Sequence, residues 1–216
     1  MSKFAIATLA TAASAGSQLF MRMDENGVAV PVTSFPLQAE APVTEVYKNG
    51  SHQKIIGYFT SWSIYGRNYF PSDIPVDKVD VINYAFANIQ GGRVVMGDSY
   101  ADSDKAYPGD CWNPGCKRGN FNQLNKMKAA NPGLRTVISI GGWTWSTNFS
   151  DIAATPASRA TFCQSAVDFA VQWGFDGIDL DWEYPVEGGL TTNHHNPADK
   201  VNYTALLKEL RERLDA

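Results

Sequence analysis

Apolar residues gather in four short runs along the chain, at residues 55–61, 79–87, 134–142 and 175–183. Short runs of this kind are typical of strands that are covered on both faces. We therefore predict four buried strands, the first of them starting just after Lys54.

Helical patterns alternate with the later runs. Apolar residues recur at helical spacing over residues 121–128, 156–173 and 197–214. Thr155-Pro156 is a typical helix start, Gly174 a typical helix end, and Asn196-Pro197 predicts the start of the last helix. Strands that alternate with helices predict a parallel α/β fold. An open doubly wound sheet and a closed barrel both fit this alternation.

The segment before Lys54 has a different character. Residues 1–15 contain one lysine, an alanine-rich apolar stretch and a small-residue pattern at Ala13-Ser14-Ala15, which together indicate a secretory signal peptide. The alternative is the frayed N-terminus of a cytosolic protein. Residues 16–53 carry three prolines and no helical period, so we expect a leader or linker with at most a stray strand.

Composition excludes several classes of protein. The chain of 216 residues has a net charge of −4, which argues against a protein that neutralises nucleic-acid phosphates. No apolar stretch reaches the roughly 18 residues that span a membrane. Gly141-Gly142 lacks the rest of a dinucleotide-binding motif. We expect no cofactor, no nucleic-acid partner and no membrane partner.

The cysteines and histidines do not predict a metal site. Cys111 and Cys116 lie close together in a turn-rich stretch, where a local disulfide is an option, and Cys163 falls in an apolar helical pattern, which indicates a buried thiol. His194 and His195 are adjacent, a spacing that does not suit zinc.

Three acidic residues at alternate positions of the fourth run are the chemical centre of the sequence. Asp179, Asp181 and Glu183 would share one face of a strand, about 6.6 Å apart. Like charges at this distance in a poorly solvated site raise at least one pKa, as a general acid near neutral pH requires. The alternatives are a magnesium site and a solvated acidic edge. The second fits poorly because Leu180 and Trp182 interleave with the acids.

Position along the strand suggests a division of roles. Glu183 would lie at the carboxyl end, where barrel active sites form, and is the best candidate for the proton donor. Asp181, one step deeper, is placed to change its partner or its proton during a reaction. Asp179, deeper still, is placed to share a proton with Asp181.

The segment Asp176-Gly-Ile-Asp-Leu-Asp-Trp-Glu-Tyr-Pro closely resembles the signature of family 18 glycoside hydrolases, the chitinases. Ser139-Ile-Gly-Gly-Trp143 resembles the family's other motif, and Tyr65-Gly-Arg-Asn-Tyr is similar to bacterial-type members. The resemblance covers residues 54–216. It implies a TIM (β/α)₈ barrel, of which this chain holds about the first four βα units.

The resemblance also implies a mechanism and a set of site residues. Glu183 would protonate the leaving oxygen and later activate water, Asp181 would orient the substrate's acetamido group, and Asp179 would tune Asp181. Ser139 would hydrogen-bond within the aspartate network, Tyr58 and Phe86 would lie on the barrel floor, and Trp143 would stack on a sugar. The substrate-binding residues expected in this way are Tyr58, Phe86, Ser139, Gly142, Trp143 and Tyr184.

The other tryptophans carry weaker signals. Trp145 and Trp182 are expected to be packing residues rather than sugar contacts. Trp62 and Trp112 stay undecided between the two roles.

The sequence therefore predicts a secreted endo-acting chitinase that binds chitin and chitooligosaccharides and is a monomer when full-length. A sugar-binding lectin on the same fold and an endo-β-N-acetylglucosaminidase are the alternatives. Nothing in the sequence matches barrel strands five to eight, which in the family complete the substrate cleft. Two strands would then be open edges, so we expect residues 1–216 alone to be poorly soluble and to have little activity.

Overall fold

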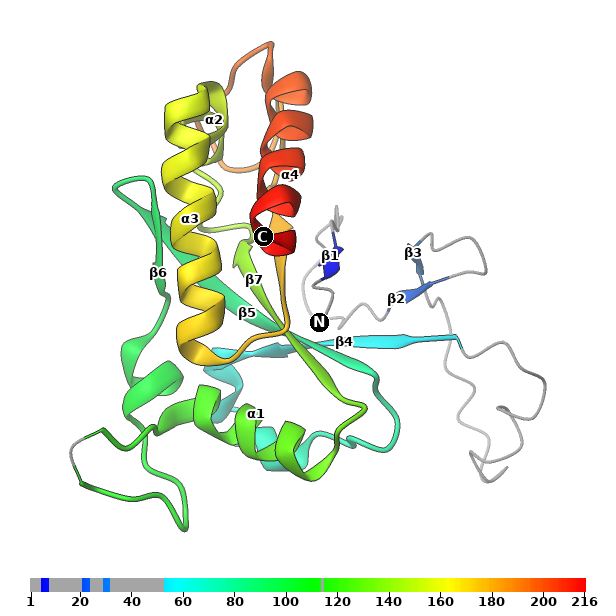
Figure 1. The fold of residues 1–216 in the computed structure, drawn as a ribbon, viewed down its shortest axis with the longest axis vertical. Coiled ribbons are helices and arrows are strands. Elements are labelled where there is room, and N and C mark those ends of the chain that lie inside the picture. The colour runs from blue at the N-terminus through cyan, green and yellow to red at the C-terminus, as the bar shows by residue number, and fades with distance from the viewer. Residues whose placement is uncertain (1–4, 8–20, 24–28, 32–52, 114) are drawn as a thin grey trace.

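Four parallel strands form the centre of the structure, a computed structural model that describes residues 5–7, 21–23, 29–31, 53–113 and 115–216. The strands are β4 (Ile55–Thr60), β5 (Val81–Gln90), β7 (Arg135–Gly141) and β8 (Gly177–Asp181), and each pairs in parallel with the next (Figure 1). All four match strands expected from the apolar runs. The prediction of a parallel α/β fold is therefore confirmed.

Three short strands extend this sheet at its two edges. β1 (Ala5–Ala7) pairs in parallel with β8, β2 (Met21–Met23) pairs antiparallel with β4, and β3 (Ala29–Pro31) pairs with β2. They fall in the segments expected as signal peptide and leader. Two of them, β2 and β3, lie within residues 16–53, so the expectation of at most one stray strand in that segment is wrong. The rest of the two segments, up to residue 52, lies outside the described residues, so their assignment as signal peptide and leader stays a prediction.

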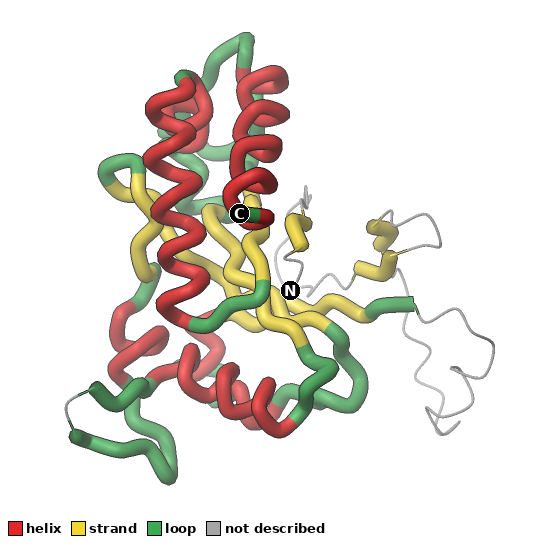
Figure 2. Tube along the Cα trace, viewed as in Figure 1, coloured by secondary structure: helices red, strands yellow, loops and turns green. Residues whose placement is uncertain are grey.

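The helices cover the sheet and close the core. They are α1 (Gly119–Ala130), α2 (Phe149–Ala154), α3 (Pro156–Trp173) and α4 (Asp199–Asp215), and Figure 2 shows α3 and α4 side by side. Ile138, Ile140, Ile178 and Leu180 of the central strands are fully buried against the helices' apolar side chains. No helix in the described part of the chain is long and apolar enough to cross a membrane.

The boundaries of α3 follow the predicted signals. The Thr155 hydroxyl accepts the N–H of Ser158 at 3.1 Å, and the Ser158 hydroxyl accepts the N–H of Thr155 at 3.1 Å. Gly174 ends the helix with a left-handed φ of 80°, a conformation that glycine adopts without steric cost. Reciprocal capping and a glycine stop thus fix both ends.

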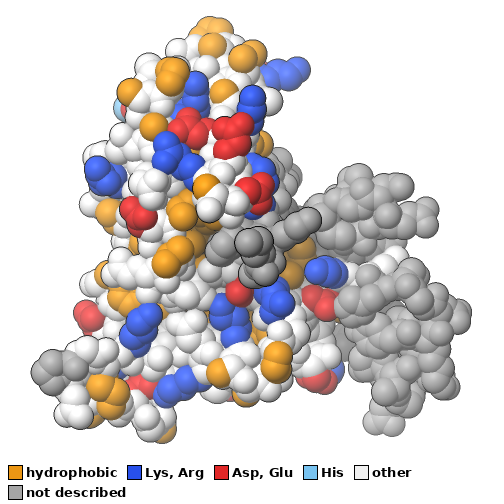
Figure 3. All heavy atoms as spheres, viewed as in Figure 1, with side chains coloured by type: hydrophobic (Ala, Val, Ile, Leu, Met, Phe, Trp, Pro, Cys, Tyr) orange, Lys and Arg blue, Asp and Glu red, His pale blue; other side chains and the backbone are white. Residues whose placement is uncertain are grey.

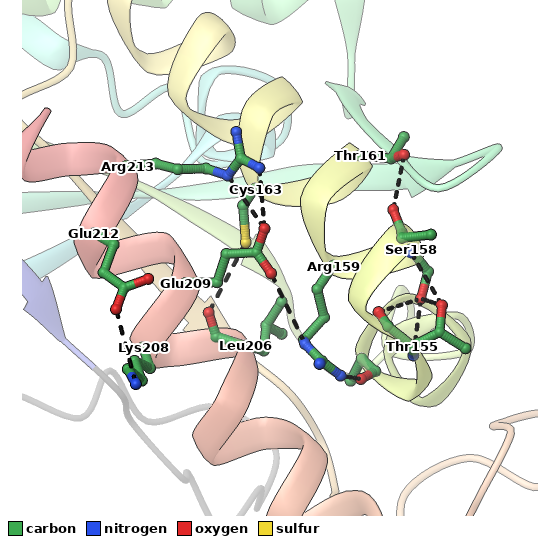
Figure 4. Close-up of polar contacts among 12 residues, drawn as sticks. Thr155, Ser158, Arg159, Thr161, Cys163, Leu206, Lys208, Glu209, Glu212 and Arg213 are labelled. Carbon is green, nitrogen blue, oxygen red and sulfur yellow. Dashed lines mark hydrogen bonds and ion pairs between the residues drawn. The ribbon is translucent and has the colours of Figure 1, made fainter.

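The contact between α3 and α4 has an apolar base and a charged rim. Cys163 is buried, with its sulfur 3.8 Å from the Leu206 carbonyl oxygen, as expected for a packed thiol. Glu209 lies between Arg213, at 3.0 Å, and Arg159, at 3.9 Å (Figure 4). Figure 3 shows basic and acidic side chains interspersed over this face.

The last helix starts later than its sequence predicts. Asn196-Pro197 was the expected start, whereas α4 begins at Asp199. The Asp199 carboxylate is buried and accepts the N–H of Asn196 at 2.8 Å and the hydroxyl of Ser150 at 2.8 Å. Because this carboxylate draws the preceding residues into a turn, helical geometry starts only after them.

A hairpin after β5 was missed by the sequence analysis. β5 continues to Gln90 and pairs antiparallel with β6 (Arg93–Met96) across Gly91-Gly92. Both glycines have positive φ, 57° and 74°, as a two-residue hairpin turn requires.

The loop after β6 is held by a buried carboxyl group. This loop contains the π-helical turn η3 (Tyr100–Asp104) and the Cys111–Cys116 disulfide. Asp102 is fully buried; its oxygens accept the Tyr84 hydroxyl and the N–H groups of Gly97 and Asp98, the latter two at 3.1 Å. Burial raises the pKa of Asp102 to about 7.

We expect Tyr84→Phe to lower the free energy of unfolding by about 1–3 kcal/mol, because it leaves the buried Asp102 carboxyl short of a donor. Urea denaturation of the protein measures this cost. Tyr69→Phe is the matched control: its hydroxyl lies at an exposed site, 3.1 Å from the Asp73 carbonyl oxygen, and its loss should cost no more than about 0.5 kcal/mol. Equal costs for the two variants would refute the role of Asp102 as an anchor.

Candidate active site

The register of the parallel strands brings distant polar side chains onto one face of the sheet. Tyr58 of β4 lies opposite Asn83 of β5, and Ser139 of β7 lies opposite Asp179 of β8. Neighbouring parallel strands present paired residues to the same face, so these side chains converge. They meet towards the carboxyl ends of the strands, where α/β proteins carry their sites.

Asp179 is the deepest acid of this group. It is fully buried, and one of its carboxylate oxygens accepts both the Tyr58 hydroxyl and the Ser139 hydroxyl, each at 2.7 Å. Burial raises the pKa of Asp179 to about 6, although the two hydrogen bonds act in the opposite direction. The structure thus brings together three residues that the sequence analysis had singled out.

Asp181 is biased towards its protonated form more strongly than Asp179. Burial, followed by the charges of Asp179 and Glu183, raises the pKa of Asp181 to about 8. Within the described residues, one buried oxygen of Asp179 and one of Asp181 have no hydrogen-bond partner. A pair of this kind holds a proton at neutral pH and titrates as a unit.

Glu183 lies two residues beyond the end of β8, and its main chain is held on both sides. Its N–H donates to the Ser146 hydroxyl at 2.8 Å, and its carbonyl oxygen accepts the Asn193 amide at 2.7 Å. The sequence analysis missed Ser146 and Asn193. Both act through backbone atoms of another residue, so neither has a chemical signature in the sequence.

Two aromatic side chains, Tyr58 and Tyr184, interact with the acids, and further rings lie next to Tyr58. Phe86 lies with its ring centre 6.5 Å from that of Tyr58 and 6.1 Å from that of Trp62. Trp62 and Trp143 are about half exposed, at 49% and 42%. Burial and the neighbouring Glu183 raise the pKa of Tyr184.

Gly142 serves the site through its backbone. Its φ is 79°, and a Cβ at this position would lie 2.8 Å from the Phe86 ring. Its N–H donates to the Asp181 carbonyl oxygen at 2.7 Å. A side chain here would push the Phe86 ring away, so this position requires glycine.

The remaining tryptophans separate into packing and exposed residues. Trp182 is buried and stacks on Phe149 at 5.3 Å, and the Trp145 ring packs against Gly97, as expected for packing side chains. Trp112 is 73% exposed on the disulfide-closed loop, beneath the Arg118 guanidinium.

The chemistry that this arrangement supports is acid–base catalysis. Glu183 is the outermost of three acids at the carboxyl end of a parallel sheet, and the deeper pair retains a proton. Over the described ranges, no group of three or more His, Cys, Asp or Glu side chains is placed to hold a metal ion. A buried row of acids flanked by aromatic rings is the type of site that glycoside hydrolases use.

Comparison with known proteins identifies the family. Residues 54–216 match the family described as glycosyl hydrolases family 18. The chain is 46% identical to Chitinase A1 of Niallia circulans over 88% of this chain and 31% of that protein. It is 44% identical to Endochitinase 1 of Metarhizium anisopliae over 88% of this chain and 42% of that protein. The chain therefore belongs to glycosyl hydrolase family 18.

A solved structure agrees with this assignment. Chitinase ChiA74 from Bacillus thuringiensis matches 75% of this chain, with a TM-score of 0.71 and 39% identity. The match covers 32% of that structure's chain. The chain thus spans less than half the length of the curated relatives named above.

We expect Asp179→Asn to lower the pKa of Asp181 below about 8, because it removes one of the two negative charges that raise it. A ¹³C NMR titration of the Asp181 carboxyl group measures the shift. Asp168→Asn, on the exposed side of α3, is the control and should leave the titration unchanged. An unchanged pKa in Asp179→Asn would contradict electrostatic coupling of the pair.

The same shifts predict how stability depends on pH. Unfolded aspartates titrate near pH 4, whereas burial raises the pKa of Asp179 to about 6 and burial with the neighbouring charges raises the pKa of Asp181 to about 8. The folded state therefore binds more protons between these values, and the contribution of the pair to stability falls as pH rises from about 4 to about 8. Urea denaturation at a series of pH values should show a shallower decline between pH 6 and 8 in Asp179→Asn than in the unsubstituted protein.

Proposed function

We propose that the full-length protein containing this chain is a chitinase. It hydrolyses the β-1,4 linkages between N-acetylglucosamine units, with retention of configuration and with Glu183 as general acid and base. The observation that carries this proposal is the row of acids at the end of β8, in which Asp179 is buried and held by two hydroxyl groups. The names of the relatives described above support the same activity.

The deeper acids favour a mechanism in which the substrate supplies its own nucleophile. Family 18 is a recognised exception to the scheme of two catalytic carboxylates. The acetamido oxygen of the sugar attacks the anomeric carbon while Glu183 protonates the leaving oxygen. Asp181 orients the acetamido group, and its proton passes to Asp179 as positive charge develops on the oxazolinium ion. Water activated by Glu183 then opens that ion.

The pKa values support this division of labour. The pair of Asp179 and Asp181 retains a proton near neutral pH because both groups are buried and like-charged. One proton on two carboxyl groups lets Asp181 ionise at the moment when a neighbouring positive charge stabilises it. The Tyr58 and Ser139 hydroxyls both donate to one oxygen of Asp179, which leaves its other oxygen available for the shared proton.

The aromatic side chains are proposed to contact the sugar chain. Tyr58 and Phe86 form the floor beneath the reacting sugar, and Trp143 stacks on a sugar beyond the cleavage point. Trp62, beside Phe86 and half exposed, joins this surface. Tyr184 lines the site next to Glu183.

We also propose that residues 54–216 form four βα units of an eight-stranded barrel, as the order of β4, β5, β7 and β8 suggests. The disulfide between Cys111 and Cys116 supports secretion, since such bonds persist in oxidising compartments. The full-length protein acts on chitin and chitooligosaccharides as a monomer.

Two other functions compete with this proposal. A lectin on the same fold would not need the acid, so the retained Glu183 argues against it. An endo-β-N-acetylglucosaminidase would use the same acids on glycoprotein N-glycans. Comparing sugar release from chitin oligomers with release from a glycoprotein separates these activities.

We expect Glu183→Gln in the full-length protein to reduce hydrolysis of chitooligosaccharides by at least about 10³-fold, because the amide cannot supply the proton. Oligosaccharide binding, measured by calorimetry, should persist because the shape of the site is unchanged. Glu187→Gln, an exposed neighbour on the same loop, is the control and should retain activity.

The unsubstituted protein decides between the enzyme and the lectin. If it binds chitooligosaccharides but never cleaves them, the lectin is the correct assignment. If Glu183→Gln retains full hydrolysis, the acid lies elsewhere and the proposed mechanism is wrong.

A further inference from the structure

The main chain around Glu183 is fixed by contacts from two separate segments. On the N-terminal side, the Glu183 N–H donates to the Ser146 hydroxyl at 2.8 Å. Ser146 in turn donates to the Gly142 carbonyl oxygen at 2.9 Å. One buried hydroxyl therefore ties Glu183, two residues beyond β8, to Gly142, the residue after β7.

On the C-terminal side, the contact comes from the loop between β8 and α4. Asn193 is 7% exposed, and its side-chain amide donates to the Glu183 carbonyl oxygen at 2.7 Å. The Asn193 side-chain oxygen, Oδ1, accepts the Thr147 hydroxyl at 3.4 Å. At Gly189, φ is 72° and any Cβ would collide with the Glu183 carbonyl oxygen. The loop is thus shaped to bring this amide to that oxygen.

The loop has anchors that do not involve Asn193. The His194 N–H donates to the Thr147 carbonyl oxygen at 3.1 Å, and the His194 ring nitrogen lies 2.6 Å from the Asp151 carboxylate. These contacts dock the loop on the segment that follows β7. The loop is therefore attached without the Asn193 amide, whose hydrogen bond holds the main chain of Glu183 instead.

We infer that Asn193 is a positioning residue for the proposed general acid. Together with Ser146, its side chain fixes the two peptide groups that flank Glu183 and so sets the direction of the Glu183 carboxyl group. This inference rests on the proposed function. It matters because a general acid must lie within about 3 Å of the oxygen that it protonates.

A neutral amide suits this position. Glu183 already lies close to the Asp181 carboxyl group and to the Tyr184 phenol. A carboxylate in place of Asn193 would add a further negative charge and would turn an oxygen towards the Glu183 carbonyl oxygen. The amide donates a hydrogen bond there and adds no charge.

The experiment compares Asn193→Ala with His194→Ala in the full-length enzyme, using two substrates. N,N′,N″,N‴-tetraacetylchitotetraose has a sugar leaving group that needs a proton, whereas 4-nitrophenyl chitobioside has an activated leaving group that needs little help. Asn193→Ala should lower kcat/KM for the tetrasaccharide about 10²-fold, mainly through kcat, because a misplaced acid fails only in the transition state. Its effect on the nitrophenyl substrate should be several-fold smaller. His194→Ala should change neither rate constant by more than about twofold, because it removes an exposed contact of the same loop.

A second variant reads out the charge at this position. Asn193→Asp has the same shape but adds a negative charge, which favours the protonated form of a nearby acid. The basic limb of the pH profile of kcat/KM should therefore move to higher pH. Asn193→Ala should leave that limb in place. The shift reports electrostatic contact between position 193 and the proposed general acid. The comparison of the two substrates separates positioning from a purely structural role.

The outcomes are distinct. Equal losses on both substrates in Asn193→Ala, or full activity on the tetrasaccharide, would overturn the positioning role while leaving the proposed function intact. A full-length protein that cleaves neither substrate would refute the proposed function itself, and the positioning role with it.

Discussion

Burial of carboxyl groups at the end of β8 is the interaction on which the rest of the site depends. An ionised carboxylate loses its hydration when it is buried, at a cost of several kcal/mol unless it is paired or protonated. The buried Asp179 carboxyl group is compensated by the Tyr58 hydroxyl from β4 and the Ser139 hydroxyl from β7. These two hydrogen bonds require β4, β7 and β8 to pair in one particular register. For Asp181, burial and the neighbouring charges raise the pKa and so favour the neutral form. The register of three strands is therefore coupled to the protonation of one pair of acids.

Asp102, which lies away from β8, is buried in a different way. Asp102 receives two backbone N–H groups and the Tyr84 hydroxyl, so every donor comes from a fixed position nearby. This arrangement secures a loop and leaves no buried oxygen of Asp102 without a partner. The acids of β8 instead retain oxygens without partners. The contrast separates a carboxyl group whose oxygens are all bonded from a pair that keeps an oxygen available on each acid.

Much of the fold and part of the site could be predicted from the sequence. The strands and α3 follow from apolar runs, the cap at Thr155 and the stop at Gly174, all of which act locally. The start of α4 could not be predicted, because the buried Asp199 carboxylate reorganises the residues before it through tertiary contacts. The acids were found because three carboxyl groups at alternate positions of an apolar strand are costly without a chemical purpose. Asn193 was not found, since an amide that bonds to a distant backbone oxygen looks like any loop asparagine.

The carboxyl end of β8 is assembled from parts of the chain that lie far apart. Tyr58 and Asp179 are separated by 121 positions, Ser139 and Asp179 by 40, and Ser146 and Glu183 by 37. Contacts of long sequence separation carry a large loop-closure cost and form slowly. During refolding, α3 and α4 can therefore gain helical structure before the acids reach their final places. Recovery of a functional site would then lag behind recovery of secondary structure, which makes the chemistry of the site a sensitive reporter of complete folding.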